Sequence, residues 1–161
     1  MEFRLVGPAT LDFITLRRNL NSPIAAVAWP DGLRLVGLEA ADIKAIHTLL
    51  QRAYSNGFGS VPPDWLDWWE ALRADSEFEP ALCFVAKAGD EVVGFCLCWT
   101  SSFIKDLVVA PEWQGHGLGT ALLATAMLAL RGRGASEVQL KVVTANAGAR
   151  RLYERMGFAV S

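Results

Sequence analysis

Apolar residues in the first half of the chain recur at a helical spacing. Ile43, Ile46, Leu50 and Ala53 fall on one face of a helix that we expect over residues 40–54. The opposite face of this segment carries mostly polar side chains. The spacing therefore predicts an amphipathic helix with one apolar stripe.

A second helical pattern is rich in tryptophan. Residues 62–64, Pro-Pro-Asp, are a typical helix start. Trp65, Trp68, Trp69 and Leu72 then follow at intervals of three and four residues. A stripe of this kind is typical of a helix face that packs into the core of a protein.

Five further segments are short and either apolar or alternating, which is typical of β-strands. They lie at residues 32–36, 82–87, 91–99, 103–109 and 137–143. Ala88-Gly89-Asp90 is a good hairpin turn between the second and the third. Residues 120–130 are apolar nearly all round, so we expect a buried helix there. Early antiparallel strands followed by a β-α-β unit predict an α/β (α+β) fold, with a mixed central sheet and helices on both faces.

Composition narrows the class of protein. The 161 residues are enough for a single domain with one core, and 52% of them are hydrophobic. The formal net charge is −2 and no basic patch is present, so nucleic acid is not an expected partner. The longest apolar run, residues 121–130, is too short to span a membrane. The first residues lack a signal-peptide pattern, so we expect a cytoplasmic protein without a membrane partner.

The cysteines indicate no metal site. Cys83, Cys96 and Cys98 lie in apolar, strand-like runs, and their spacing matches no common zinc pattern. The chain has only two histidines. We therefore expect reduced cysteines in the core and no bound metal.

The loop from Gln114 to Gly119 reads Gln-Gly-His-Gly-Leu-Gly and connects a predicted strand to a predicted helix. Its three glycines let the backbone approach a ligand without Cβ clashes. Several N–H groups at the start of the following helix are unpaired and lie at the positive end of its dipole. The loop is therefore suited to bind a phosphate or pyrophosphate.

Two common phosphate-binding patterns do not fit this loop. Gly119 is followed by Thr120 rather than by the lysine of a P-loop, and the glycine spacing differs from that of the dinucleotide fingerprint. The pattern is Gln-x-x-Gly-x-Gly, and residues 107–111 before it read Leu-Val-Val-Ala-Pro. It resembles the acetyl-CoA loop of the GCN5-related N-acetyltransferase (GNAT) superfamily, Arg/Gln-x-x-Gly-x-Gly/Ala.

A second segment strengthens this resemblance. The family commonly shows Asn-x-x-Ala-x-x-Leu-Tyr-x-x-x-Gly-Phe after the next strand. Every fixed position matches, at Asn146, Ala149, Leu152, Tyr153, Gly157 and Phe158. The two motifs stand in the right order within residues 103–158, and they imply an acyl-CoA N-acyltransferase-like fold.

The resemblance also implies a site for acetyl-CoA. The backbone amides of residues 114–120 would cradle the pyrophosphate, and the strand before the loop would pair with the pantetheine amides. A backbone N–H of that strand would stabilise the oxyanion that forms from the thioester. For His116 an exposed loop position is the alternative. The expected cofactor-binding residues are Leu107, Val108, Val109, Gln114, Gly115, His116, Gly117, Leu118, Gly119, Thr120, Asn146 and Tyr153.

Two residues are candidates for catalysis. Tyr153 matches a tyrosine that often acts as general acid in the family, and a phenol can protonate a leaving thiolate. A packed aromatic position is the alternative for this residue, and both roles are compatible. Asp106 is the nearest acid and would act as base through water, or it is a structural carboxylate. Asn146 suits both a cofactor contact and a helix N-cap.

The chain departs from the family pattern at its ends. Two further strands normally follow the Gly-Phe pair, whereas Ser161 comes three residues after Phe158. Residues 1–18 contain two strand-like runs, and we hypothesise that they supply this hairpin by circular permutation. Residues 19–31 would be a linker and residues 32–161 the main body of a single domain. Exchange of the hairpin in a dimer and an unrelated extension are the alternatives.

The resemblance implies an N-acetyltransferase that moves an acetyl group from acetyl-CoA to a primary amine in a ternary complex. No cysteine lies in the motif segments to support a covalent route. The alternatives are a non-catalytic acyl-CoA-binding module and a transferase of a longer acyl group. The family builds its acceptor site around its first two helices, so the tryptophan stripe would then be a pocket wall.

The acceptor amine is not fixed by the sequence, and small molecules and peptides both fit. A strongly cationic acceptor would require an acidic cluster at the pocket. The candidates for this cluster, which also suit a solvated helix face, are Asp64, Asp67, Glu70, Glu77 and Glu79. A homodimer is common among similar proteins, so self-association is a further expectation.

Overall fold

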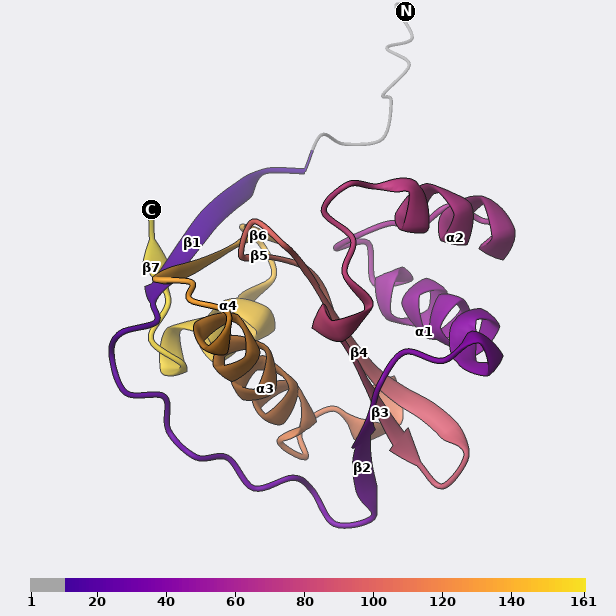
Figure 1. Ribbon diagram of the computed structural model, residues 1–161, viewed down its shortest axis with the longest axis horizontal. Helices are drawn as coiled ribbons and strands as arrows, with labels where there is room; N and C mark the ends of the chain where they lie inside the picture. Colours follow the sequence, from indigo (N-terminus) through magenta and orange to yellow (C-terminus); the bar gives the residue numbers. More distant parts are fainter. Residues whose placement is uncertain (1–10) are drawn as a thin grey trace, which may run out of the picture.

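The computed structural model describes residues 11–161. These residues form one seven-stranded sheet with helices on both faces (Figure 1). The strands are β1 Phe13–Asn19, β2 Leu33–Val36, β3 Cys83–Ala88, β4 Glu91–Trp99, β5 Phe103–Val109, β6 Glu137–Val143 and β7 Ala159–Val160. The α-helices are α1 Ile43–Tyr54, α2 Trp65–Ala74, α3 Leu118–Gly132 and α4 Ala147–Arg155, with short 3-10 helices η1 Ala40–Asp42, η2 Pro80–Leu82 and η3 Pro111–Trp113.

The sheet is mixed, with the strand order β2-β3-β4-β5-β6-β1-β7. Strands β5 and β6 are parallel, and the other neighbours are antiparallel. Helices α1 and α2 lie on one side of the sheet, and α3 and α4 lie on the other (Figure 1). The α/β (α+β) fold class predicted from the sequence is confirmed.

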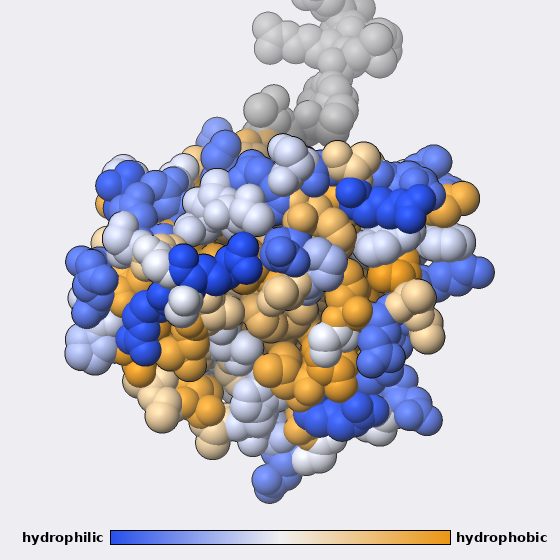
Figure 2. All heavy atoms as spheres, viewed as in Figure 1, coloured by the Kyte–Doolittle hydropathy of each residue, from blue (hydrophilic) through white to orange (hydrophobic). Residues whose placement is uncertain are grey.

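Strand β4 lies at the centre of the core. Its residues 92–98 are all buried, because helices cover both faces of the strand. Gly94 allows α3 to approach closely, since a Cβ there would lie 2.9 Å from Leu122 Cδ1. Over the surface seen in Figure 2, hydrophilic and apolar residues are interspersed.

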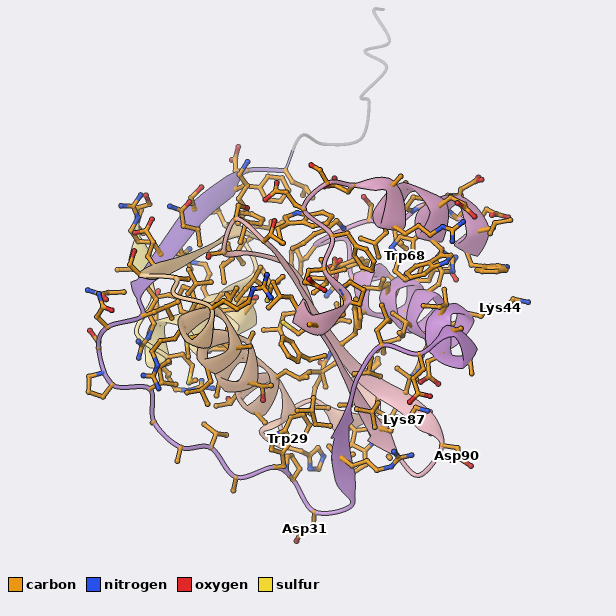
Figure 3. All side chains as sticks on the ribbon, in the orientation of Figure 1. Trp29, Asp31, Lys44, Trp68, Lys87 and Asp90 are labelled. Carbon is orange, nitrogen blue, oxygen red and sulfur yellow. The ribbon has the colours of Figure 1, made fainter. Side chains whose placement is uncertain are left out.

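The tryptophan stripe belongs to the core. Trp68 is buried and lies between α1 and α2, where its ring centroid is 5.6 Å from that of His47 (Figure 3). Trp65 and Trp69 are half-buried and pack against the same core. The Nε2 of His47 hydrogen-bonds the carbonyl oxygen of Pro62 at 2.7 Å, which ties α1 to the segment before α2. The interpretation of this stripe as a pocket wall therefore has no support in the structure.

Strand β1 lies between β6 and β7, far from β2, which is the next strand along the chain (Figure 1). It pairs with β6 along its whole length, from Phe13 opposite Val143 to Asn19 opposite Glu137. Its other edge pairs with β7, so the C-terminal residues supply the second strand here. The run at residues 3–7, predicted as that second strand, lies outside the described residues.

Arg18 links β1 to the end of α4. Its Nε donates to the carbonyl oxygen of Met156 at 2.8 Å, and its Nη2 donates to the carbonyl oxygen of Pro23 at 2.8 Å. These hydrogen bonds connect both ends of the described chain. They also hold the start of the connection that runs to β2.

Candidate active site

Strands β5 and β6 diverge after a short paired stretch. Only Phe103 with Gln139 and Ile104 with Leu140 are paired between them. Beyond these positions two adjoining clefts open, with volumes of about 600 Å³ and 410 Å³. We call the larger the loop cleft, because the glycine loop lines it, and the smaller the strand cleft, because β1, β5 and β6 line it. Both clefts share Tyr54, Phe58, Leu107, Asn146, Ala149 and Tyr153.

The glycine loop exposes backbone groups to the loop cleft. Gly115 and Gly117 have φ values of +80° and +88°, which favour glycine over other residues. Helix α3 begins without a capping side chain, whereas the Asp64 side chain caps α2 and that of Asn146 caps α4. The first N–H groups of α3 are therefore left for an anionic ligand. This arrangement fits the pyrophosphate that the sequence predicted.

The predicted cofactor-binding residues gather at this cleft, with one exception. Those that line it are Leu107, Val108, Val109, Gln114, Gly115, Gly117, Leu118, Gly119, Thr120, Asn146 and Tyr153. His116 is not among the lining residues; it is exposed, and its ring centroid lies 5.6 Å from that of Trp113. The Nε2 of Gln114 donates to the carbonyl oxygen of Val109 at 3.3 Å and so ties the loop to the end of β5.

The loop cleft is also lined by two arginines that occupy no fixed position of either sequence motif. Arg151 and Arg155 lie one turn apart on α4, and no acidic residue lines this cleft among the residues that the structure describes. The charge of the cleft therefore suits an anion. Their spacing of four residues was the available signal, but exposed arginines at that spacing are common on helices.

A β-bulge shapes the floor of the strand cleft. Leu97 lies opposite Asp106 and Cys98 lies opposite Ile104, so Lys105 is an extra residue in β5. A bulge places two successive side chains on the same side of the sheet. Lys105 and Asp106 accordingly form an ion pair, with 3.2 Å between Nζ and Oδ2.

The carboxylate of Asp106 is buried and held by two donors. Its Oδ2 accepts from Lys105, and its Oδ1 accepts from the hydroxyl of Tyr54. Asp106 lines the strand cleft only, whereas Tyr54 lines both clefts. Burial, followed by the charge of Asp106, raises the pKa of Tyr54 far above its usual value of about 10, so this phenol stays a hydrogen-bond donor. Tyr54 belongs to no motif and is the last residue of α1.

Tyr153 lies where the two clefts meet. It is 8% exposed, and its ring centroid is 5.8 Å from that of Phe158. Burial is the main reason why its pKa is raised, and the neighbouring Cys96 adds to the shift. Within residues 11–161 its hydroxyl has no hydrogen-bond partner, so the group is free to meet a ligand. Packing against the core and access to both clefts coexist at this residue.

Asn146 has the cap role that the sequence predicted. Its Oδ1 accepts from the backbone N–H of Ala149 at 3.3 Å, at the start of α4. The residue also lines both clefts.

The acidic side chains of the α2 region lie elsewhere. None of the acids proposed as a cationic-acceptor cluster lines either cleft. Asp64 and Glu79 cap helix starts, Glu70 pairs with Arg73, and Glu77 accepts from the backbone of Ser101. A cluster suited to a strongly cationic acceptor is therefore absent from the clefts, as far as residues 11–161 form them.

Glu112 lies at the entrance of the glycine loop and pairs with Arg52, with 2.6 Å between Nη2 and Oε2. A backbone hydrogen bond and then this arginine lower the pKa of its carboxyl group. The pair links the end of α1 to η3 on the outside of the molecule.

The cysteines are buried thiols. Burial raises the pKa of Cys83 to about 12, and a hydrogen bond with Cys98, together with burial, raises that of Cys96. Neither thiol is therefore a ready nucleophile. Within the described part of the chain, no group of three or more His, Cys, Asp or Glu side chains is placed to hold a metal ion. No helix in that part is long and apolar enough to cross a membrane.

A mixed sheet whose central strands diverge beside a glycine loop defines the class of acyl-CoA N-acyltransferase-like proteins. The chain belongs to the acetyltransferase (GNAT) family, which it matches over residues 43–158. This confirms the family predicted from the two motifs.

Relatives cover a range of acetyltransferases. The chain is 34% identical over 160 residues to a mycothiol acetyltransferase of Thermobispora bispora, covering 89% of this chain and 52% of the relative. It is 33% identical over 87 residues to human N-alpha-acetyltransferase 30, covering 49% of this chain and 24% of the relative. A GCN5-related N-acetyltransferase from Sphaerobacter thermophilus superposes with a TM-score of 0.79 at 26% identity, covering 92% of this chain and 48% of the other. The chain thus spans about half the length of the mycothiol acetyltransferases that it matches.

Proposed function

We propose that this protein transfers an acetyl group from acetyl-CoA to a primary amine in a ternary complex. The observation that carries the proposal is the meeting of the two clefts at Tyr153. The loop cleft offers uncapped amides and arginines to the phosphates of CoA, and the strand cleft offers a separate path to an amine. The relatives named mycothiol acetyltransferase and N-alpha-acetyltransferase 30 support acetyl transfer, and the second name is consistent with an amine acceptor.

In this proposal the strand before the loop positions the thioester. β5 is unpaired with β6 beyond Ile104, so the backbone around Leu107 has groups available to the pantetheine amides. One N–H there would bond the carbonyl oxygen as negative charge develops on it. The amine nitrogen then forms the N–C bond while the C–S bond breaks and its electron pair moves to sulfur.

Two protons must move in this reaction, and two residues are placed to help. One proton leaves nitrogen, and Asp106 is the acceptor that we propose, directly or through a water molecule. Each of its oxygens keeps a lone pair beyond the one that Tyr54 or Lys105 occupies. One proton reaches sulfur, and the neutral phenol of Tyr153 is the donor, since its raised pKa keeps it protonated.

Calorimetric titration with acetyl-CoA and with CoA tests the first step. We expect binding by the native protein and loss of binding by Gly117→Trp, whose indole would occupy the loop cleft. Gly32→Trp is the matched control, because Gly32 also has a positive φ and open space around it but lies at the turn before β2.

An assay for free thiol with a library of amines then tests turnover. Acetyl-CoA binding without any thiol release would instead support a non-catalytic acyl-CoA-binding module. The tryptophans of α2 line neither cleft, so the tryptophan stripe does not support transfer of a longer acyl group. The absence of binding by folded native protein would contradict the whole proposal.

We also propose that β1 takes the place of a strand that follows the Gly-Phe pair in the family. The family match begins at residue 43, so β1 lies outside it, yet β1 is an integral strand between β6 and β7. We expect that deletion of residues 1–18 prevents cooperative folding. A soluble, cooperatively folded remainder would show that the segment is only an appendage.

Variants of Arg18, together with sedimentation, test whether β1 is an integral strand of the sheet within one chain. Arg18→Ala removes the hydrogen bonds to Met156 and Pro23 and should lower the free energy of unfolding by about 1–3 kcal/mol. Arg17→Ala, which affects only an exposed ion pair at 3.8 Å, should cost less than about 1 kcal/mol. A folded monomer in sedimentation with these effects would support insertion in cis, whereas an obligate dimer would favour exchange.

A further inference from the structure

We infer that the acceptor is an amine that also carries a carboxylate, and that Lys141 in the strand cleft binds this second group. The inference rests on the proposed function, because it concerns the acceptor side of the same site. It is carried by the register of three strands and by the charges of one cleft.

The register places two lysines side by side. Ile104 of β5 pairs with Leu140 of β6 in parallel, so Lys105 and Lys141 are the next residues along both strands. Because side chains alternate, Lys141 points to the opposite side of the sheet from Leu140. The bulge keeps Lys105 on the same side as Asp106, which is the side that faces Tyr54.

Only one of these lysines has a partner. Lys105 pairs with Asp106, and the charge of both is thereby balanced. Lys141 is exposed and forms no ion pair within residues 11–161. The charged residues that line the strand cleft are Lys105, Asp106 and Lys141, so the described cleft carries one uncompensated positive charge. An anionic group of a ligand would compensate it.

The rest of the cleft wall is apolar and aromatic. Phe13, Phe58 and Phe103 line it together with aliphatic side chains of β5 and β6. Phe13 lies opposite Val143 and Thr15 lies opposite Lys141, so Phe13 and Lys141 share one face of the sheet. This wall suits an apolar side chain, and the acids proposed for a cationic acceptor are absent from it. The ligand that fits has an amine near Asp106, a carboxylate near Lys141 and an apolar body.

A carboxylate of this kind has two sources. One is the α-carboxylate of a free amino acid, and the other is an acidic side chain near the N-terminus of a peptide. Two substrate pairs distinguish them. The first pair is phenylalanine against phenylalaninamide, and the second is a peptide amide with phenylalanine first and glutamate second against the same peptide with glutamine second.

The experiment measures kcat/KM for all four acceptors with the native protein and with Lys141→Ala. For at least one pair we expect the native protein to prefer the carboxylate form, and we expect Lys141→Ala to reduce this preference by about tenfold. Lys141→Glu should reverse the preference through repulsion. The ratio between proteins cancels the different intrinsic reactivities of acid and amide.

Lys44→Ala is the matched control. Lys44 is an exposed lysine of α1 whose Nζ lies 4.9 Å from the centroid of the Trp65 ring, away from both clefts (Figure 3). It should leave the preference unchanged, whichever source of the carboxylate is used.

Three results would overturn the inference. They are an equal preference in the native protein and Lys141→Ala, no preference in the native protein, and no turnover of either carboxylate form by protein that binds acetyl-CoA. Turnover of other amines with the first two results would leave the acetyltransferase proposal intact. Failure to bind acetyl-CoA would remove the proposed function, and with it the inference.

Discussion

The two clefts of this molecule are built in different ways. The loop cleft is made mainly from two continuous segments. One is the glycine loop with the end of β5 and the start of α3, and the other runs from Asn146 through α4. Its main ligand groups are backbone amides, which any sequence with the right glycines can present. The strand cleft is made from side chains of β1, α1, β5, β6 and α4, which come together only in the folded chain.

This difference separates what is general from what is specific. Under the proposed function, the site of backbone amides binds the phosphates of acetyl-CoA, and it should tolerate few changes at its glycines. A site of side chains from five elements can change its acceptor by substitution without loss of the cofactor. We therefore expect substitutions in the loop cleft to alter acetyl-CoA binding, and substitutions in the strand cleft to alter use of the amine.

Tyr153 lies in both clefts, so its substitution should have the largest effect. Tyr153→Phe keeps the ring that packs on Phe158 but removes the proton donor. We expect kcat to fall about a hundredfold or more, with little change in acetyl-CoA affinity or thermal stability. Steady-state kinetics and calorimetry on the same preparation measure this. Unchanged kcat would mean that the residue is only a packed aromatic.

Tyr54→Phe tests whether the strand cleft depends on the carboxylate that Tyr54 holds. The variant keeps the ring but removes the donor to Asp106, leaving Lys105 as its partner. We expect kcat/KM for the amine to fall about tenfold and the acetyl-CoA affinity to stay the same. Thermal denaturation of the variant checks the cause, since a lower kcat/KM at unchanged stability indicates an effect within the cleft. A parallel loss of stability and of acetyl-CoA affinity would indicate a structural role instead.

The same contrast explains what could be read from the sequence. The glycine loop and the Asn146 to Phe158 segment were found because each is continuous and its spacing has a physical reason. The strands and helices followed from periodicity, and the structure places them within a few residues of the predicted bounds. The family and fold class were accessible for that reason.

Residues of the strand cleft were less accessible. Tyr54 ends an amphipathic helix, and nothing local indicates that its hydroxyl meets a carboxylate 52 positions later. In the sequence Lys105 resembles any surface lysine, and only the bulge in β5 places its side chain on the same side as that of Asp106. His116 is the reverse case, since its place within the motif suggests a cofactor contact, but its exposed side chain does not line the loop cleft, and the contact stays a prediction.

The two arginines of α4 test the loop cleft, the other of the two clefts compared. The double variant Arg151→Ala with Arg155→Ala should weaken acetyl-CoA binding by about fivefold at low salt, and less at high salt, because exposed charges are screened. The KM for the amine should not change. Calorimetry at two salt concentrations measures the effect, and Arg131→Ala at the far end of α3 is the control. An equal loss of acetyl-CoA affinity in the control would mean that the net charge of the protein, and not the position of the two arginines, causes the effect.

Substitution of Phe13 should have the smallest effect, and it should most clearly separate use of the amine from binding of acetyl-CoA. It is 54% exposed, lines only the strand cleft and comes from the strand that lies outside the family match. Phe13→Ala removes apolar surface that an acceptor would cover, so we expect KM for an apolar amine to rise roughly threefold. The acetyl-CoA affinity should be unchanged.

Leu35→Ala is a suitable control for Phe13→Ala, because Leu35 is also an exposed apolar strand residue and lines neither cleft. A change in acetyl-CoA affinity in Phe13→Ala would mean that β1 supports the loop cleft as well, and the two clefts would no longer be separable. An effect on the amine alone would show that β1 does more than complete the sheet. In that case β1, which we propose as the replacement of a family strand, also contributes to the choice of acceptor.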